Sequence, residues 1–397
     1  MDLLAARHPI YDDKLRVAAY ELVMHARHED GALHEGHGAA TPDAVNAIAD
    51  GLVGSHPVHV KVSRDVLLSG AASLLPADRI VLEVTPAAGA DEPLAEAMRS
   101  LRDSGHVVVL DGFPYSDDTL PLIRAARLVK VDASGLGEAE LEKEVARFRT
   151  ELEGGLIATG VETHEILQVC RGLGFGLFQG FFFLEPKVES GGEIRPNELA
   201  RMRLLGKLQE PDPDFDELQD VISQDIGLSY ALLRFVNSAF FALPRKVESV
   251  RDAAVLLGIS NMRRWATLSV LASNDDSKPS ELMVAGLTRA RMCELLAPAY
   301  GQSDSDAFFT AGLFSIVDAL MDAPMIQVLS ELPFSEEINA AILNFEGVKG
   351  QAVRAAIAWE RANLSELITP PGMSVGEVGD TYREAVSWAA GAAAGLS

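Results

Sequence analysis

The sequence predicts two domains of different fold class, an α/β barrel followed by an all-helical domain. Over residues 16–183, short β-rich runs alternate with helical stretches, which is typical of a mostly parallel sheet. From residue 199 onward, apolar residues recur every three or four positions with almost no alternating runs, which indicates helices. Residues 184–198 contain two prolines and a Gly-Gly pair, so we expect a domain boundary there.

The N-terminal strands are expected where short β-rich runs are separated by helical stretches. About seven such runs within 190 residues suit a small (β/α) barrel of the TIM type better than an open sheet. The candidate strands are residues 16–23, 57–63, 79–85, 106–111, 128–132, 155–159 and 176–183. Helical patterns cover residues 91–104 and 138–153, and the second is acidic at its start, as the helix dipole favours. The expected division is a barrel at 1–187, a linker at 188–198 and a helical domain at 199–397.

Charge and composition exclude several classes of partner. The chain has 397 residues, is 48% hydrophobic and carries a net charge of −24. Nucleic acids and anionic membrane surfaces attract clustered Lys and Arg, so we expect neither as a partner. The N-terminus has acids where a signal peptide needs bases, and no stretch is apolar enough to span a membrane. We therefore expect a cytoplasmic protein.

The distribution of histidine and cysteine limits metal chemistry. All nine histidines lie at or before His164, so we expect no imidazole-ligated metal in the helical domain. Cys170 and Cys293 lie far apart and form no paired motif, which favours buried thiols over a disulfide or a zinc site.

Carboxylates stand at or near the ends of several candidate strands. The carboxyl ends of parallel barrel strands meet at one rim, where oxygen ligands can bind Mg²⁺ or Ca²⁺. Acidic residues at strand ends are also ordinary surface residues, and the pattern alone leaves both interpretations open. The residues concerned are Glu21, Glu83, Asp111, Asp132 and Glu162.

Both halves of the chain resemble known bacterial signalling domains. The segments AAYELVMHAR, HVKVS, IVLEVTP, VVVLDGF, LVKVD, IATGVET and FGLFQGFFFLEP resemble an EAL domain, a phosphodiesterase domain that hydrolyses cyclic di-GMP. The stretches RMRLLGKLQ, LLRFVNSAFFALPRKVESVRDAAVLLG, TRARMCELLA and FTAGLFSIVDALM resemble an HDOD domain, a helical relative of HD-type metal phosphohydrolases. The resemblance implies a signalling regulator that lacks the activities of either parent domain.

The resemblance also implies a site in the barrel, part of which has changed. Glu21, Glu83 and Asp111 match acidic metal ligands of the EAL motif, Lys130 matches its lysine, and Glu162 and Gln179 match residues of its last two motifs. Five positions depart from the motif. Lys61 replaces a metal-binding Asn, Gly112 a second Asp, Thr159 a Glu, His25 a substrate-binding Arg, and Pro86 a Glu of the catalytic loop.

These departures lead to a functional hypothesis. We expect a non-enzymatic regulator that acts through protein partners, uses no cofactor or metal and binds cyclic di-GMP poorly. Lys61 is expected to substitute for a metal ion by holding Glu21, Glu83 and Asp111 together. Two alternatives stay open: a metal-dependent cyclic di-GMP phosphodiesterase with a reduced metal site, and a cyclic di-GMP receptor without catalysis.

Overall fold

The computed structural model divides the chain into two compact units. Unit 1 consists of Met1–Glu185 and Ala358–Leu367, and unit 2 of Pro186–Ile357 and Ile368–Ser397. The structure describes residues 3–27, 33–35, 42–187, 202, 204–209, 219, 222–223, 226–237, 247, 249–272 and 278–396. The predicted linker at 188–198 lies outside these residues. The predicted helical domain was continuous from 199 to 397, whereas Ala358–Leu367 belongs to the barrel unit.

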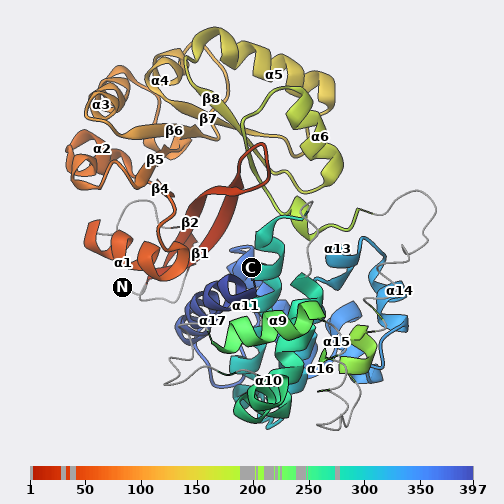
Figure 1. Cartoon of the computed structure of the whole chain (residues 1–397). Coiled ribbons are helices and arrows are strands. Elements are labelled where there is room, and N and C mark those ends of the chain that lie inside the picture. Colours follow the sequence, from red (N-terminus) through yellow and green to blue (C-terminus); the bar gives the residue numbers. More distant parts are fainter. Residues whose placement is uncertain are drawn as a thin grey trace. The chain divides into compact units, whose positions relative to one another are not determined.

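Unit 1 contains a closed barrel of eight strands (Figure 1). The ring runs β1-β2-β4-β5-β6-β7-β8-β9 and closes because β1 also pairs with β9, while the short β3 pairs with β2 outside the ring. All neighbours in the ring are parallel except β1, which is antiparallel to both β2 and β9. The strands are β1 Leu3–Tyr11, β2 Val17–Arg27, β3 Leu33–Glu35, β4 Val58–Lys61, β5 Ile80–Val84, β6 Val107–Asp111, β7 Leu128–Asp132, β8 Gly155–Thr159 and β9 Leu177–Gln179.

The predicted barrel and its seven strands are confirmed, and β1 is the strand of the ring that the sequence pattern missed; the short β3 outside the ring was not predicted either. The β1 sequence LLAARHPIY has Arg, His and Pro in succession, which reads as a break in a strand. In the folded protein Arg7 is buried, its guanidinium donates to the carbonyl of Leu52 at 2.7 Å, and it lies 4.6 Å from the ring centroid of Tyr20. Tertiary contacts therefore stabilise a strand that local sequence does not favour.

Helices lie outside the ring of strands, in the connections that parallel strands require (Figure 1). Side-chain caps begin several of them. Asp91 accepts from the backbone N–H of Leu94 at the start of α3, and Thr163 accepts from that of Ile166 at the start of α6. These helices are α1 Pro42–Val53, α2 Arg64–Leu68, α3 Glu92–Asp103, α4 Leu120–Ala125, α5 Glu138–Glu151 and α6 His164–Gly172.

The interior of the barrel contains an apolar layer. Ile10, Ala19, Val109 and Ile157 are buried together, and further apolar side chains from the neighbouring strands pack against them. Strand side chains alternate between the two faces, so the residue two positions further along each strand also points inward. The residues that pack against this cluster are Val81, Val107, Leu128 and Leu177.

Unit 2 is helical throughout its described residues, as the spacing of apolar residues predicts. Its core is apolar and includes Phe308, Phe314 and the buried face of α11. The helix α10 changes direction at Gly258, whose φ of 75° is in the left-handed region. The helices are α9 Ile226–Val236, α10 Val250–Ala272, α11 Ser280–Leu296, α12 Ser305–Phe314, α13 Val317–Met321, α14 Met325–Ser330, α15 Glu336–Asn344, α16 Gly347–Glu360 and α17 Val375–Leu396.

The hydropathy of the helices bears on the predicted location. Among the residues that the structure describes, none of the helices combines the length and apolar character needed to cross a membrane.

Candidate functional site

A polar layer lies above the apolar layer inside the barrel. Each of its members follows an apolar inward-facing residue by two positions on the same strand, as the period of a strand requires. Val81 precedes Glu83, Val109 precedes Asp111, and Leu128 precedes Lys130. Parallel strands therefore bring these polar side chains to one level of the barrel. The members are Glu21, Glu83, Asp111, Lys130, Thr159 and Gln179.

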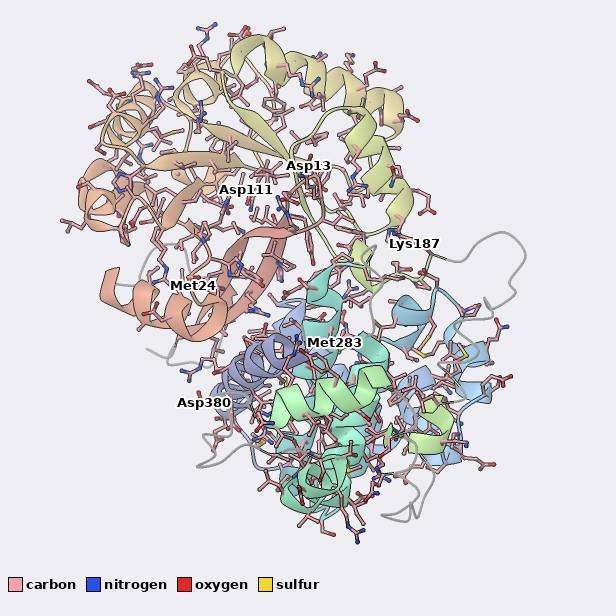
Figure 2. The ribbon with its side chains drawn as sticks, viewed as in Figure 1. Asp13, Met24, Asp111, Lys187, Met283 and Asp380 are labelled. Atoms are coloured by element: carbon pink, nitrogen blue, oxygen red, sulfur yellow. The ribbon has the colours of Figure 1, made fainter. Side chains whose placement is uncertain are left out.

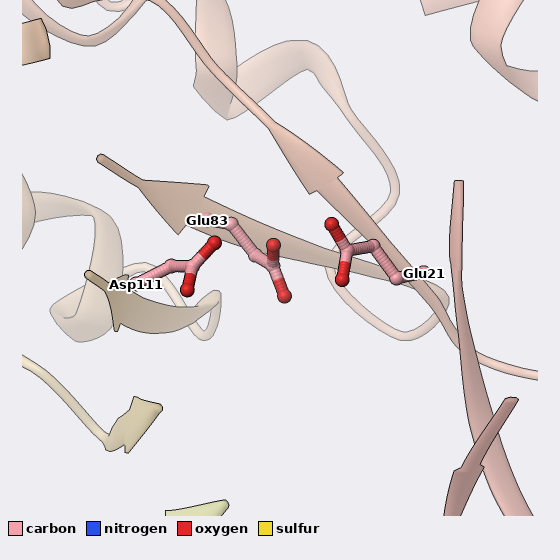
Figure 3. Close-up of side chains that lie close together, drawn as sticks. All are labelled: Glu21, Glu83 and Asp111. Carbon is pink, nitrogen blue, oxygen red and sulfur yellow. The ribbon is translucent and has the colours of Figure 1, made fainter. Parts of the chain in front are cut away.

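Three carboxylates of this layer converge. Glu21 on β2, Glu83 on β5 and Asp111 at the end of β6 each place one oxygen within 4.8 Å of the others. Figure 3 shows the three side chains turned toward a common space, with Glu83 between the other two. Figure 2 labels Asp111 inside the barrel unit. Glu21 and Glu83 are buried and Asp111 is half-buried, so these carboxylates repel one another unless positive charge lies nearby.

Lys130 supplies the first positive charge. Its ammonium lies 2.7 Å from Oε2 of Glu21 and 2.5 Å from Oε1 of Glu83, and its side chain is only 1% exposed. Gln179 donates from Nε2 to the same oxygen of Glu21 at 2.6 Å, and Nδ1 of His59 lies 2.8 Å from Oε1 of Glu83. Both buried carboxylates therefore have fixed orientations.

Lys61 supplies the second positive charge. Its ammonium lies 3.4 Å from Oε1 of Glu21 and 3.7 Å from Oδ2 of Asp111, at the end of β4. This placement agrees with the expectation that Lys61 faces the carboxylates. These distances are longer than those of Lys130, and the side chain is more exposed, so Lys61 is held less tightly.

The ion pairs set the protonation of the cluster. Burial alone raises the pKa of Glu21, but the ammonium groups of Lys130 and Lys61 outweigh it and hold that pKa well below its usual range. Burial alone lowers the pKa of Lys130, but Glu21 and Glu83 raise it above its ordinary value. Burial raises the pKa of Asp111, although Lys130 acts in the opposite direction. Glu21 and Lys130 are therefore both charged at neutral pH.

The cluster fits one hard divalent cation. Carboxylate oxygens are the donors that Mg²⁺, Mn²⁺ and Ca²⁺ prefer. Oε2 of Glu83 is buried and has no hydrogen-bond partner among the described residues, which leaves an acceptor oxygen available inside the protein. With all five groups ionised, the three carboxylates and two lysines carry a net charge of −1, which favours a cation, although Lys61 competes with it.

A cavity of about 390 Å³ opens beside the cluster, which is a size typical of small-molecule sites. It brings together most of the residues that the sequence analysis singled out. Glu83 is fully buried and does not line the cavity. The singled-out residues that line the cavity are Glu21, His25, Lys61, Asp111, Lys130, Thr159, Glu162 and Gln179.

Gly112 and Asp132 do not line the cavity. Gly112 has a φ of 74°, and a Cβ built there would lie 3.7 Å from Cδ of Pro86. Two of the positions that depart from the EAL motif are therefore neighbours in space. Asp132 is exposed and accepts a hydrogen bond from the backbone N–H of Ser134, which is an ordinary structural role at a strand end.

The residues of the site that were not predicted from the sequence include His59 and Arg361. His59 precedes Lys61 by two positions on β4, and that spacing was a usable signal that both side chains share a strand face. Arg361 lines the cavity although it lies 199 residues after Glu162, with which it pairs. No local pattern in the sequence marks Arg361, because only the tertiary fold places it there.

The described residues of unit 2 contain no comparable cluster. The group Glu21, Glu83 and Asp111 is the one set of three potential metal ligands found among the residues that the structure describes. Asn237, near the end of α9, accepts from the backbone N–H of Val247 and donates to its carbonyl, which is a structural role.

Comparison with known families matches both halves of the chain. A model of the EAL domain matches residues 59–186, and a model of the HDOD domain matches residues 198–332. The cyclic di-GMP phosphodiesterase CdgJ of Vibrio cholerae is 31% identical over 294 residues, which cover 73% of this chain and 67% of that protein. The uncharacterized protein YuxH of Bacillus subtilis is 28% identical over 406 residues and covers 98% of both chains.

Solved structures of EAL domains are similar to part of the chain. An EAL domain protein from Listeria monocytogenes is 16% identical, with a TM-score of 0.38, over 46% of this chain and 87% of that one. A calcium and cyclic di-GMP complex of BlrP1 from Klebsiella pneumoniae is 23% identical, with a TM-score of 0.36, over 46% of this chain and 55% of that one.

The relative from Vibrio cholerae corrects two predictions. The prediction of a non-enzymatic regulator that acts through protein partners is contradicted, because a protein 31% identical to this chain is named a phosphodiesterase. The prediction that cyclic di-GMP is a poor ligand is contradicted by the same finding. Both predictions gave most weight to the changed positions Lys61, Gly112 and Thr159. The structure shows instead that the three carboxylates remain together.

The order of the two domains identifies the family. Part of the barrel unit matches the EAL model, the following region matches the HDOD model, and a relative with 31% identity covers 73% of the chain. The chain therefore belongs to the family of EAL-HDOD proteins, in which an EAL domain is followed by an HDOD domain.

Proposed function

We propose that the barrel is a metal-dependent phosphodiesterase that hydrolyses cyclic di-GMP with a reduced metal site. The observation that carries the proposal is the convergence of Glu21, Glu83 and Asp111 within 4.8 Å beside a cavity. The name of the relative from Vibrio cholerae supports the choice of substrate.

Hydrolysis of a phosphodiester requires a positive charge near the phosphate and an oriented water molecule. Hydrolysis adds water across one P–O bond of the ring, so that one phosphodiester becomes a phosphomonoester and the leaving oxygen takes a proton. Glu21, Glu83 and Asp111 would hold one divalent cation, which supplies Lewis-acid stabilisation of charge on the phosphate when bound. Because all three donors are carboxylates, we infer a hard divalent cation rather than a soft transition metal.

The other residues of the cluster orient these ligands. Lys130 and Gln179 hold Oε2 of Glu21, and Lys130 and His59 hold Oε1 of Glu83. One oxygen of each carboxylate is thereby fixed, which leaves the other to face the cavity or a cation. Removing a residue that orients a metal ligand in this way typically lowers metal affinity or activity by about 10–100-fold.

The test is hydrolysis of cyclic di-GMP by the full chain with Mg²⁺ or Mn²⁺, followed by chromatography of the products. We expect turnover that EDTA abolishes. Glu21→Gln should lower kcat by more than about 100-fold, since direct ligands exceed the effect of their supporting partners. Asp111→Asn is a second variant with less risk to folding, because its side chain is only half-buried.

Asp132→Asn is the matched control. It also removes a carboxylate from a strand end, but Asp132 does not line the cavity, so activity should be unchanged. Absence of turnover by the parent chain at micromolar protein contradicts the proposal.

A second candidate is a receptor that binds cyclic di-GMP without hydrolysing it. The observation that favours it is Lys61, whose ammonium lies 3.4 Å from Glu21 and 3.7 Å from Asp111 and competes with a cation. Calorimetry with the same nucleotide separates the candidates. Binding in EDTA without turnover in Mn²⁺ would identify the receptor.

A further inference from the structure

A segment of ten residues joins the barrel unit from the far end of the chain. Ala358–Leu367 belongs to unit 1, although the residues on both sides of it belong to unit 2. Trp359 anchors it, because its indole is buried and donates from Nε1 to the carbonyl of Ala5 on β1 at 3.3 Å. Leu364 is also buried. This segment is therefore part of the barrel's packing.

The backbone of the segment has a defined conformation at the end of α16. The N–H of Ala362 donates to the carbonyl of Trp359 at 2.9 Å, and that of Asn363 donates to the carbonyl of Ala358 at 2.8 Å. These two bonds form a Schellman motif, with Ala362 in the left-handed region at a φ of 55°. Glycine is the residue that normally occupies this position. The motif fixes the direction in which the preceding residue, Arg361, leaves the helix.

Arg361 extends into the mouth of the cavity. Its guanidinium lies 4.6 Å from the ring centroid of Phe181 and 3.4 Å from Oε2 of Glu162, and all three residues line the cavity. The side chain of Arg361 is 41% exposed. The contact with the aromatic ring uses no N–H donor, and the hydrogen bond to Glu162 uses one nitrogen, Nη1, of a guanidinium that has five N–H donors.

The contact with Glu162 is weak enough to be exchanged. At 3.4 Å it is at the long limit of a hydrogen bond, and the Glu162 side chain is 44% exposed. Ion pairs between side chains of this exposure contribute little, because water screens them. A phosphate oxygen in the cavity can therefore replace the carboxylate with little loss.

A positively charged side chain in the cavity would favour the binding of a phosphodiester. Glu21, Asp111 and Glu162 line it with negative charge, and a phosphodiester is an anion. The EAL motif would place an arginine at position 25, where this chain has His25 in the lining of the same cavity. Lys61 and Lys130 are already paired with carboxylates. Arginine binds phosphate through two parallel N–H donors, which histidine does not offer.

We propose that Arg361 is the phosphate-binding arginine of the barrel, supplied from the distant segment Ala358–Leu367 in place of the arginine absent at position 25. This inference rests on the proposed binding of cyclic di-GMP. It makes a residue outside the stretch matched by either family model a part of the nucleotide site.

The test compares Arg361→Ala and Arg361→Lys in the full chain. Binding of cyclic di-GMP is measured by calorimetry in EDTA, and kcat and KM are measured separately with Mn²⁺. We expect Arg361→Ala to raise Kd and KM about 10–100-fold, as hydrogen bonds to a charged group imply. Arg361→Lys should recover only part of the loss, since an ammonium lacks the paired donors.

Arg147→Ala is the matched control. Arg147 also lies beside an aromatic ring, that of Tyr115 at 5.9 Å, and near one carboxylate, that of Glu144 at 3.8 Å, and it is 48% exposed. It does not line the cavity, so its removal should leave nucleotide binding unchanged. Thermal unfolding of each variant shows whether the fold is intact.

The outcomes separate this inference from the proposed function. If the parent binds and Arg361→Ala binds equally well, Arg361 is not the phosphate ligand while the proposed function stands. If the parent neither binds nor hydrolyses the nucleotide, both fail. If Arg361→Ala loses binding and Arg361→Lys recovers it fully, the positive charge alone accounts for binding, and the proposed contact of two parallel N–H donors with the phosphate is wrong.

Discussion

Two buried lysines, one in each unit, have opposite surroundings. Lys130 in the barrel lies between Glu21 and Glu83, and all three side chains are almost fully buried. Lys349 in the helical unit is also buried, but its partner Glu337 is 61% exposed, and its ammonium lies 5.6 Å from the ring centroid of Phe308. Lys349 thus carries its charge to the surface on an apolar stem.

The difference shows which buried charge indicates chemistry. The free-energy cost of removing Lys130, Glu21 and Glu83 from water can exceed the gain from their two ion pairs, so the cluster is weak evidence for a role in stability alone. That cluster also borders a cavity. Lys349 has a sufficient structural explanation in its packing. We expect a functional role for buried charged groups that converge beside a cavity, and a structural role for a single buried lysine whose ammonium reaches solvent.

The largest expected effect is the loss of the ammonium of Lys130. Lys130→Met keeps the stem but leaves two buried carboxylates facing each other, so the free energy of unfolding should fall by about 3–5 kcal/mol. Lys349→Met should cost about 1 kcal/mol or less, because its partner is exposed. Urea unfolding of both variants measures the difference. Equal losses would remove the distinction between the two lysines.

An intermediate effect is expected where helices of unit 2 approach closely. A Cβ at Gly312 on α12 would lie 2.6 Å from the carbonyl oxygen of Arg289 on α11, and backbone atoms cannot move aside easily. Gly312→Ala should therefore destabilise by about 1–3 kcal/mol. Gly391→Ala on α17 is the control, since nothing lies within 4 Å and alanine favours the helix. Thermal unfolding should show the two changes with opposite sign, and a stable Gly312→Ala would contradict the close packing.

The smallest effect concerns the two thiols, one in each unit. Burial raises the pKa of Cys170 to about 11 and that of Cys293 to about 12. A thiol in the unfolded chain loses its proton at about pH 8.5, whereas the folded protein keeps it protonated. The contribution of each thiol to the free energy of unfolding is therefore complete below about pH 8.5 and declines as the pH rises above it. The decline ends at about pH 11 for Cys170 and about pH 12 for Cys293. Neither thiol should react with iodoacetamide at pH 8.5 unless urea is present, and rapid native labelling of either would contradict its burial.

Much of the fold was predictable because its signals are local. The strands that supply Glu83, Asp111 and Lys130 are short apolar runs with a polar residue near the end, and each was predicted to within two residues. The strand β1 was missed because Arg7, His8 and Pro9 interrupt its pattern. Its stability comes from the pairing with β2 and from the contact between Arg7 and Leu52.

The candidate site was predictable in part. Strand ends indicated Glu21 and Asp111, and the resemblance to the EAL motif indicated Lys61. The structure places the ammonium of Lys61 within ion-pair distance of both carboxylates. The inference that their changed neighbours abolish function was wrong, because it counted lost residues without the positions of those that remain. Arg361 could not be predicted as a site residue because no local sequence pattern connects it to the barrel.

The sequence by itself determined the two fold classes, the absence of histidine after His164 and the level of the barrel at which charged side chains gather. These follow from periodicity and composition, which are properties of neighbouring residues. The contact of Lys130 with two carboxylates, the placement of Lys61 near two other carboxylate oxygens and the presence of Arg361 in the cavity lining follow from the folded structure. Such pairings depend on distances between residues far apart in the chain, and folding alone sets those distances.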